Sequence, residues 1–111
     1  MKLPPNTQIA PKKLREYLLV WQGKDDKSQW LASAGYTINN WPVLQQDLRD
    51  QVLSKEAVFI ESTRFGQMYE IRAELKGPNG KVLFIRSYWM IEAVTEQAKF
   101  ITLFPNKERI G

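Results

Sequence analysis

The stretch that decides the fold is residues 81–91, which read Lys-Val-Leu-Phe-Ile-Arg-Ser-Tyr-Trp-Met-Ile. In a strand, alternate side chains point to opposite faces. Here both sets are largely apolar, which is typical of a central strand covered on both sides. One set nevertheless contains Arg86 and Tyr88. A guanidinium in that position needs an anionic partner, because desolvating an unpaired charge is costly. The partner is either a carboxylate of the same chain or a bound ligand. In the first case Arg86 is structural, and in the second it belongs to a functional site.

The segments around this stretch predict an antiparallel meander. Residues 77–80 read Gly-Pro-Asn-Gly, a strong turn signal. Before them, residues 67–76 alternate apolar and charged side chains, as a half-buried antiparallel strand does. A β-rich segment precedes Gly66, and a final apolar segment ends at Pro105. The predicted strands are residues 57–65, 67–76, 81–91 and 99–104.

The first half of the chain has helical periodicity instead. Three apolar stripes occur at helical spacing: Leu14, Tyr17, Leu18 and Trp21; Trp30, Leu31 and Ala34; and Leu44, Leu48 and Val52. They predict helices over about residues 11–20, 26–34 and 40–54. The second begins at a capping-box-like sequence led by Asp26 and ends at Gly35, and the third is capped by Asn39 and Asn40.

These elements predict an α+β domain in which three N-terminal helices pack on a four-stranded antiparallel β-meander. A length of 111 residues fits a single domain. We expect residues 1–111 to form that domain, with a core over about 12–105 and loose ends at 1–10 and 106–111.

Composition excludes several kinds of site. The chain has no cysteine and no histidine. Disulfides, zinc–thiolate sites, cysteine nucleophiles and serine–histidine triads are therefore excluded, and we expect neither a metal nor a cofactor. The net charge of +4 mildly favours an anionic partner such as RNA, although many small domains of this charge bind no polyanion.

The sequence predicts a cytoplasmic protein that does not enter the membrane. No apolar run approaches the ~20 residues of a membrane-spanning helix, and the first residues lack the apolar core of a signal peptide. A domain released from a larger secreted toxin would look similar.

Five segments together resemble a bacterial domain family. They are residues 13–19 (Lys-Leu-Arg-Glu-Tyr-Leu-Leu), 27–35, the turn at 77–80, residues 86–89 (Arg-Ser-Tyr-Trp) and 100–105 (Phe-Ile-Thr-Leu-Phe-Pro). The resemblance is to an uncharacterised family of unknown function, related to the C-terminal modules of polymorphic toxins with the barnase–EndoU–colicin–RelE ribonuclease-like fold. This chain departs from the family at Phe104, where a tyrosine is usual, and in residues 20–24, which lack a frequent histidine.

The resemblance implies a metal-independent endoribonuclease. RelE-like members cleave RNA without a histidine dyad, using lysines, arginines and a tyrosine. Carried over to this chain, Arg86 and Arg72 bind the scissile phosphate and Tyr88 or Lys27 transfers protons. Thr102 matches the family's threonine. The partners implied are RNA and a protein such as an antitoxin.

Other interpretations remain open from the sequence. Arg86 is a structural ion-pair partner if it binds Glu70, Glu74 or Glu92, with Tyr88 as aromatic cover. The same sheet face then serves a non-catalytic module that binds protein or RNA, or a degenerate toxin relative that keeps only the fold. The four tryptophans suit base stacking if exposed, but their apolar stripes favour core packing.

Overall fold

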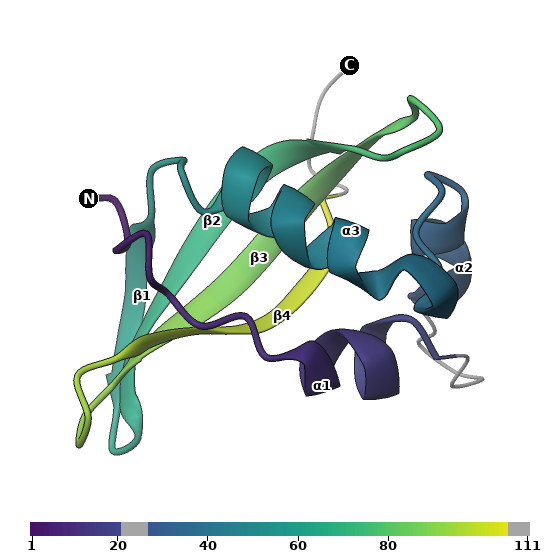
Figure 1. Ribbon diagram of the computed structural model, residues 1–111. Coiled ribbons are helices and arrows are strands. Elements are labelled where there is room, and N and C mark those ends of the chain that lie inside the picture. The colour runs from purple at the N-terminus through teal and green to yellow at the C-terminus, as the bar shows by residue number, and fades with distance from the viewer. Residues whose placement is uncertain (21–26, 107–111) are drawn as a thin grey trace.

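The computed structural model describes residues 1–20 and 27–106. Short helical segments come first along the chain, and four strands follow them within the described residues (Figure 1). The helical segments are α1 (Pro11–Lys13), the π-helical turn η1 (Leu14–Leu18), α2 (Ser28–Ala32), the 3₁₀ turn η2 (Ile38–Asn40), α3 (Trp41–Asp47) and the π-helical turn η3 (Leu48–Val52). The strands are β1 (Val58–Thr63), β2 (Gly66–Lys76), β3 (Val82–Glu92) and β4 (Ala98–Pro105).

The strands form an antiparallel meander in the order β1-β2-β3-β4. The predicted α+β class and antiparallel sheet are therefore confirmed, and each strand boundary lies within a residue or two of its predicted position. In the longest pairing, β2 with β3, Arg72 lies directly opposite Arg86 and Tyr69 directly opposite Trp89.

The helical segments pack on one face of the sheet (Figure 1). That face carries the core, including Ile71, Leu75, Ile85 and Trp89, all fully buried. No described helix covers the other face, here called the open face, which carries the side chains between these core positions. The expectation that β3 is covered on both sides is therefore wrong for the described residues. Arg86 and Tyr88 are half-buried. Their long side chains cover part of the open face themselves, so β3 does not need a second layer of helices there.

The tryptophans that the structure describes belong to the core side. Trp89 is fully buried and packs edge-on against Phe100, with 5.1 Å between ring centroids. Trp30 and Trp41 are partly buried against the same core. Trp21, the remaining member of the predicted set, lies outside the described residues.

The first predicted helix contains a π-turn that changes which residues face the core. The Leu19 amide donates to the Leu14 carbonyl oxygen five residues earlier, at 3.0 Å. The wider turn places Leu14, Leu18 and Leu19 in the core, whereas Tyr17 is 42% exposed. The prediction that Tyr17 is buried is therefore wrong.

The second predicted helix is shorter than expected, and the third is not one regular helix. The third is a 3₁₀ turn, an α-helix and a π-turn in succession, and the capping box at its start joins Thr37 to Asn40. The predicted cap at Asn39–Asn40 is confirmed in part: Asn40 is the N-cap residue of α3 and Trp41 and Pro42 begin that helix, but the Asn40 side chain makes no capping hydrogen bond to α3. The second helix ends at Ala32, and Gly35 lies in the turn that follows it with the expected left-handed backbone, at a φ of +98°. The predicted cap of this helix, Asp26, lies outside the described residues. None of the described helices is long and apolar enough to cross a membrane.

The first ten residues are held by the fold, contrary to the expectation of a loose end. Leu3 and Ile9 are buried in the core. The Gln8 amide donates to the Ala98 carbonyl oxygen at 2.9 Å, and the Gln8 carbonyl oxygen accepts from the Phe100 amide at 2.8 Å. The extended lead-in thus borders β4. At the other end, the Asn106 amide donates to the Phe84 carbonyl oxygen at 2.7 Å; residues 107–111 of the expected tail lie outside the described residues.

Candidate functional site

The core side of β3 fixes the direction in which Arg86 and Tyr88 point. The buried Trp89 donates through its indole Nε1 to Ser87 Oγ at 2.8 Å. Ser87 Oγ donates in turn to the Ile71 carbonyl oxygen, also at 2.8 Å. Because successive side chains of a strand point to opposite faces, Arg86 and Tyr88 lie on the open face.

The sheet register brings two further predicted site residues to the same face. Arg72 of β2 lies directly opposite Arg86, and Thr102 of β4 lies directly opposite Tyr88. Directly opposed residues of an antiparallel pair have Cβ atoms about 5 Å apart. Arg72, Arg86, Tyr88 and Thr102 therefore form one patch across three strands of the open face.

Lys27 joins this patch from the residue that precedes α2. Its Nζ donates to Thr102 Oγ1 at 3.1 Å and to the Tyr17 hydroxyl at 3.4 Å. The same Nζ lies 3.8 Å from the centroid of the Phe104 ring, which is close enough for a cation–π interaction. The five predicted site residues, from Lys27 to Thr102, thus lie together. We call them, with Glu70, the open-face cluster.

Glu70 is the carboxylate of this cluster. It lies opposite Tyr88, whose hydroxyl donates to Glu70 Oε2 at 2.9 Å, and Glu70 Oε1 accepts from Arg72 Nε at 2.9 Å. The Glu70 side chain is only 11% exposed. From the sequence, Glu70 was expected as an ion-pair partner of Arg86 or of its neighbour Arg72, and not as a catalytic group. Its position two residues before Arg72 on an alternating strand is the signal that places it on the same face.

Burial and the contact with Glu70 make the Tyr88 phenol harder to ionise. The pKa of Tyr88 is raised above its usual value, first by burial and then by the hydrogen bond to Glu70 and its negative charge. The charges of Arg86 and Arg72 act on this pKa in the opposite direction. At neutral pH Tyr88 is therefore a hydrogen-bond and proton donor, and not a base.

The cluster combines anion-binding and proton-transfer groups. Lys27, Arg72 and Arg86 are cations that can bind a phosphate, and guanidinium groups match phosphate oxygens in a two-pronged geometry. Glu70 can accept a proton and Tyr88 can donate one. Glu70 accepts hydrogen bonds from Arg72 and Tyr88, and Glu92 accepts one from Lys99 at 3.0 Å. Nowhere in residues 1–20 and 27–106 do three acidic side chains lie together as a metal site.

Comparison with protein-family models gives a match over residues 2–107 to the family described as "Domain of unknown function (DUF6883)". Comparisons with curated proteins and with solved structures found no match. Because the family model covers nearly the whole chain, the chain belongs to this family. The expectation of a family of unknown function is therefore confirmed, and its link to toxin modules is a matter of proposal.

Proposed function

We propose that this member of the family is a metal-independent, toxin-related endoribonuclease that acts in the cytoplasm. The observation that carries the proposal is the convergence of Lys27, Arg72, Arg86, Tyr88 and Thr102 around Glu70. The resemblance to ribonuclease-like toxin modules supports RNA as the substrate, and it also supports a protein partner of the antitoxin kind.

Cleavage begins with the removal of a proton from the 2′-hydroxyl next to the scissile phosphate. Glu70 is the proton acceptor, because its carboxylate is fixed by Tyr88 and Arg72 and little exposed to water. As the proton leaves, the 2′-oxygen forms a bond to phosphorus. The extra negative charge on the phosphate oxygens is stabilised by Arg72 and Arg86, which face each other across β2 and β3.

The step ends when the bond from phosphorus to the 5′-oxygen breaks and that oxygen receives a proton. Tyr88 is the proton donor, since its raised pKa keeps the phenol protonated at neutral pH. Lys27 adds a further positive charge beside Thr102. The products are a 2′,3′-cyclic phosphate and a free 5′-hydroxyl, and every group that the step uses is a side chain of this chain.

A non-catalytic binding module is the second candidate, and the Glu70–Arg72 pair favours it. The carboxylate neutralises one of the cations that would bind RNA, which makes the open face less attractive to a polyanion. In this case Arg86 and Tyr88 form part of a surface for a protein or RNA partner, and their removal weakens binding without changing any chemistry.

The test is RNA cleavage by purified protein in EDTA, with wild type beside Glu70→Gln, Arg86→Ala and the control Lys55→Ala. Lys55 lies exposed in the turn after η3, so the control removes a positive charge outside the cluster. We expect Lys55→Ala to cleave like wild type. Loss of a general base lowers rates by about 10²- to 10⁴-fold, so Glu70→Gln should be slower by that factor, and Arg86→Ala by at least 10²-fold.

Expression in bacteria gives a second readout. A ribonuclease should slow growth, and Arg86→Ala should relieve the effect at equal protein levels. Intact RNA with every variant, together with normal growth on abundant soluble protein, would favour the binding module instead.

A further inference from the structure

A hollow lies on the open face beside the open-face cluster, where the β1–β2 turn meets the β3–β4 turn. It has a volume of about 330 Å³ and is lined mainly by apolar side chains. Phe65 and Val94 line it from the two turns, and Met90 and Ile101 line it from β3 and β4. Phe65 is 63% exposed and Val94 is 94% exposed, so the hollow offers apolar surface directly to solvent.

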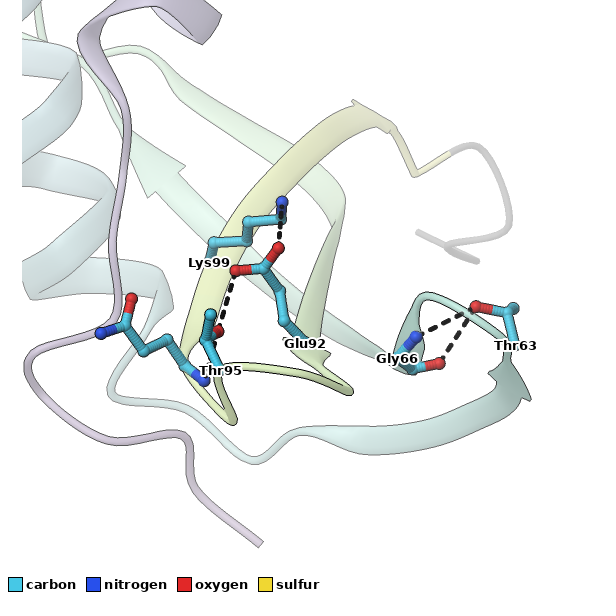
Figure 2. Close-up of polar contacts among 6 residues, drawn as sticks. Thr63, Gly66, Glu92, Thr95 and Lys99 are labelled. Carbon is cyan, nitrogen blue, oxygen red and sulfur yellow. Dashed lines mark hydrogen bonds and ion pairs between the residues drawn. The ribbon is translucent and has the colours of Figure 1, made fainter.

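Phe65 is exposed, but its backbone is fixed. Thr63 Oγ1 accepts hydrogen bonds from the Phe65 amide at 3.1 Å and the Gly66 amide at 3.3 Å, and it donates to the Gly66 carbonyl oxygen at 3.1 Å. Figure 2 shows the contacts between Thr63 and Gly66. The Ala93 amide binds the Phe65 carbonyl oxygen at 2.9 Å, which ties the two turns together. A Cβ atom on Gly66 would lie 2.3 Å from the Ile91 carbonyl oxygen, so the close approach of the turns requires this glycine.

Charged groups give the hollow a polar rim. The Arg64 guanidinium lies 4.9 Å from the centroid of the Phe65 ring. Lys99 Nζ donates to Glu92 Oε2 at 3.0 Å, and Thr95 donates to Glu92 Oε1 at 3.1 Å, as Figure 2 shows. These two bonds hold the Glu92 carboxylate in place, where it can accept from the N–H groups of a base. Two cations against one carboxylate leave the rim positive, which suits a ligand with a phosphate.

The hollow adjoins the cluster along β3 and β4. Met90 is two residues beyond Tyr88 on the same face, a distance of about 7 Å along a strand. On β4, Met90 lies opposite Lys99 of the hollow, and Tyr88 lies opposite Thr102 of the cluster. A nucleotide next to a phosphate bound at Arg86 therefore reaches the hollow without leaving the open face.

We propose that this hollow binds one base of single-stranded RNA, stacked on Phe65, beside the scissile phosphate. An exposed aromatic ring flanked by arginine is the arrangement on which single-stranded nucleic acids stack. The inference rests on the proposed function for its choice of RNA, and it adds a base-binding subsite that the open-face cluster does not contain.

The experiment measures binding of a fluorescent 2′-O-methyl RNA oligonucleotide by anisotropy at one fixed salt concentration. The methyl group removes the attacking hydroxyl, so binding is measured apart from cleavage. The variants are Phe65→Ala, Phe65→Leu and Phe65→Trp, with Phe59→Ala as the matched control. Phe59 lies on β1 and is also about half exposed, at 52%, but it does not line the hollow.

We expect Phe65→Ala and Phe65→Leu to bind about tenfold more weakly than wild type, because base–aromatic stacking is lost. Phe65→Trp should keep wild-type affinity, and Phe59→Ala should leave it unchanged. Equal binding by Phe65→Ala and Phe59→Ala would overturn the subsite, even if the protein cleaves RNA. So would wild-type affinity in Phe65→Leu, which would show a general apolar surface, or an absence of RNA binding by wild type. If RNA binding depends on the Phe65 ring but the protein does not cleave RNA, the base-binding subsite is supported and the proposed ribonuclease activity is wrong.

Discussion

At the residue scale, the contacts of Glu70 decide how protons are shared in the cluster. Its two carboxylate oxygens accept from different partners, Tyr88 and Arg72. Burial and then the carboxylate raise the pKa of the Tyr88 phenol, while Arg86 and Arg72 lower it. The assignment of Glu70 as acceptor and Tyr88 as donor depends on this balance.

Glu70→Gln should lower the pKa of Tyr88. The substitution removes the negative charge that opposes formation of the phenolate, and it leaves the two arginine charges that favour the phenolate. Ultraviolet titration of tyrosine ionisation should show one group moving to lower pH. That group should be absent in Tyr88→Phe, which serves as the control. An unchanged titration curve would show that Glu70 does not govern the phenol.

Sequence alternation placed Arg72, Arg86 and Tyr88 on one face, because a strand has a strict period of two. Alternation does not distinguish a structural ion pair from a proton acceptor, so Glu70 was not assigned a role. Lys27 was a candidate through the resemblance and through its place near the start of a predicted helix. Its contacts with Thr102 and Phe104 come from the tertiary fold, which local periodicity does not report.

At the element scale, Tyr36 connects the helical layer to the sheet. Its side chain is fully buried, and its hydroxyl lies 2.7 Å from Asp47 Oδ2 on α3 and 3.1 Å from the Lys76 carbonyl oxygen at the end of β2. Burial, and then the Asp47 carboxylate, raise the pKa of Tyr36 well above its usual range. The hydroxyl therefore stays protonated and continues to donate as the pH rises.

Tyr36→Phe should lower the free energy of unfolding by about 1–3 kcal/mol, because Asp47 and the Lys76 carbonyl oxygen lose a buried partner. Tyr69→Phe is the matched control. Its hydroxyl meets only the Gln67 side chain among the described contacts, so it should cost less than about 1 kcal/mol. Urea denaturation measures both values. A Tyr36→Phe protein as stable as Tyr69→Phe would contradict the proposed link.

The loss of stability should also depend on pH. The pKa of Tyr36 is raised on folding, so the unfolded chain releases this proton first as the pH rises past about 10. The stability that Tyr36 contributes is full below that pH and declines above it. The difference between wild type and Tyr36→Phe should therefore shrink in alkaline solution.

Strands were easier to predict than helices in this chain for a physical reason. Strand limits follow from local alternation and from turn residues such as those at 77–80. The limits of the helices depend on the π-turns η1 and η3. In each, a carbonyl oxygen accepts a hydrogen bond from the amide five residues later in the chain. The apolar spacing of Leu14 and Leu18 suits either kind of turn, so the exposure of Tyr17 was not foreseen.

At the scale of the whole molecule, the two faces of the sheet differ in what covers them. One sheet face is buried under the helical segments (Figure 1). The open face carries the cluster and the hollow. The α+β class was predictable because helical and strand periodicities occupy different halves of the chain. The absence of a helical layer on the open face was not predictable, because the β3 side chains on that face are themselves mostly apolar. The anchoring of residues 1–10 was missed because it depends on contacts with residues far away in the sequence, among them the bridge from Gln8 to Lys99 and the burial of Leu3, Thr7 and Ile9.

The chemical identity of the RNA ends after cleavage in EDTA is the measurement that tests the central claim most directly. Attack by the 2′-hydroxyl predicts a 2′,3′-cyclic phosphate on one product and a 5′-hydroxyl on the other. It also predicts that a single 2′-deoxy nucleotide at the cleaved position abolishes the cut without abolishing binding. A 3′-hydroxyl with a 5′-phosphate, or RNA that stays intact with the wild-type protein, would contradict the account.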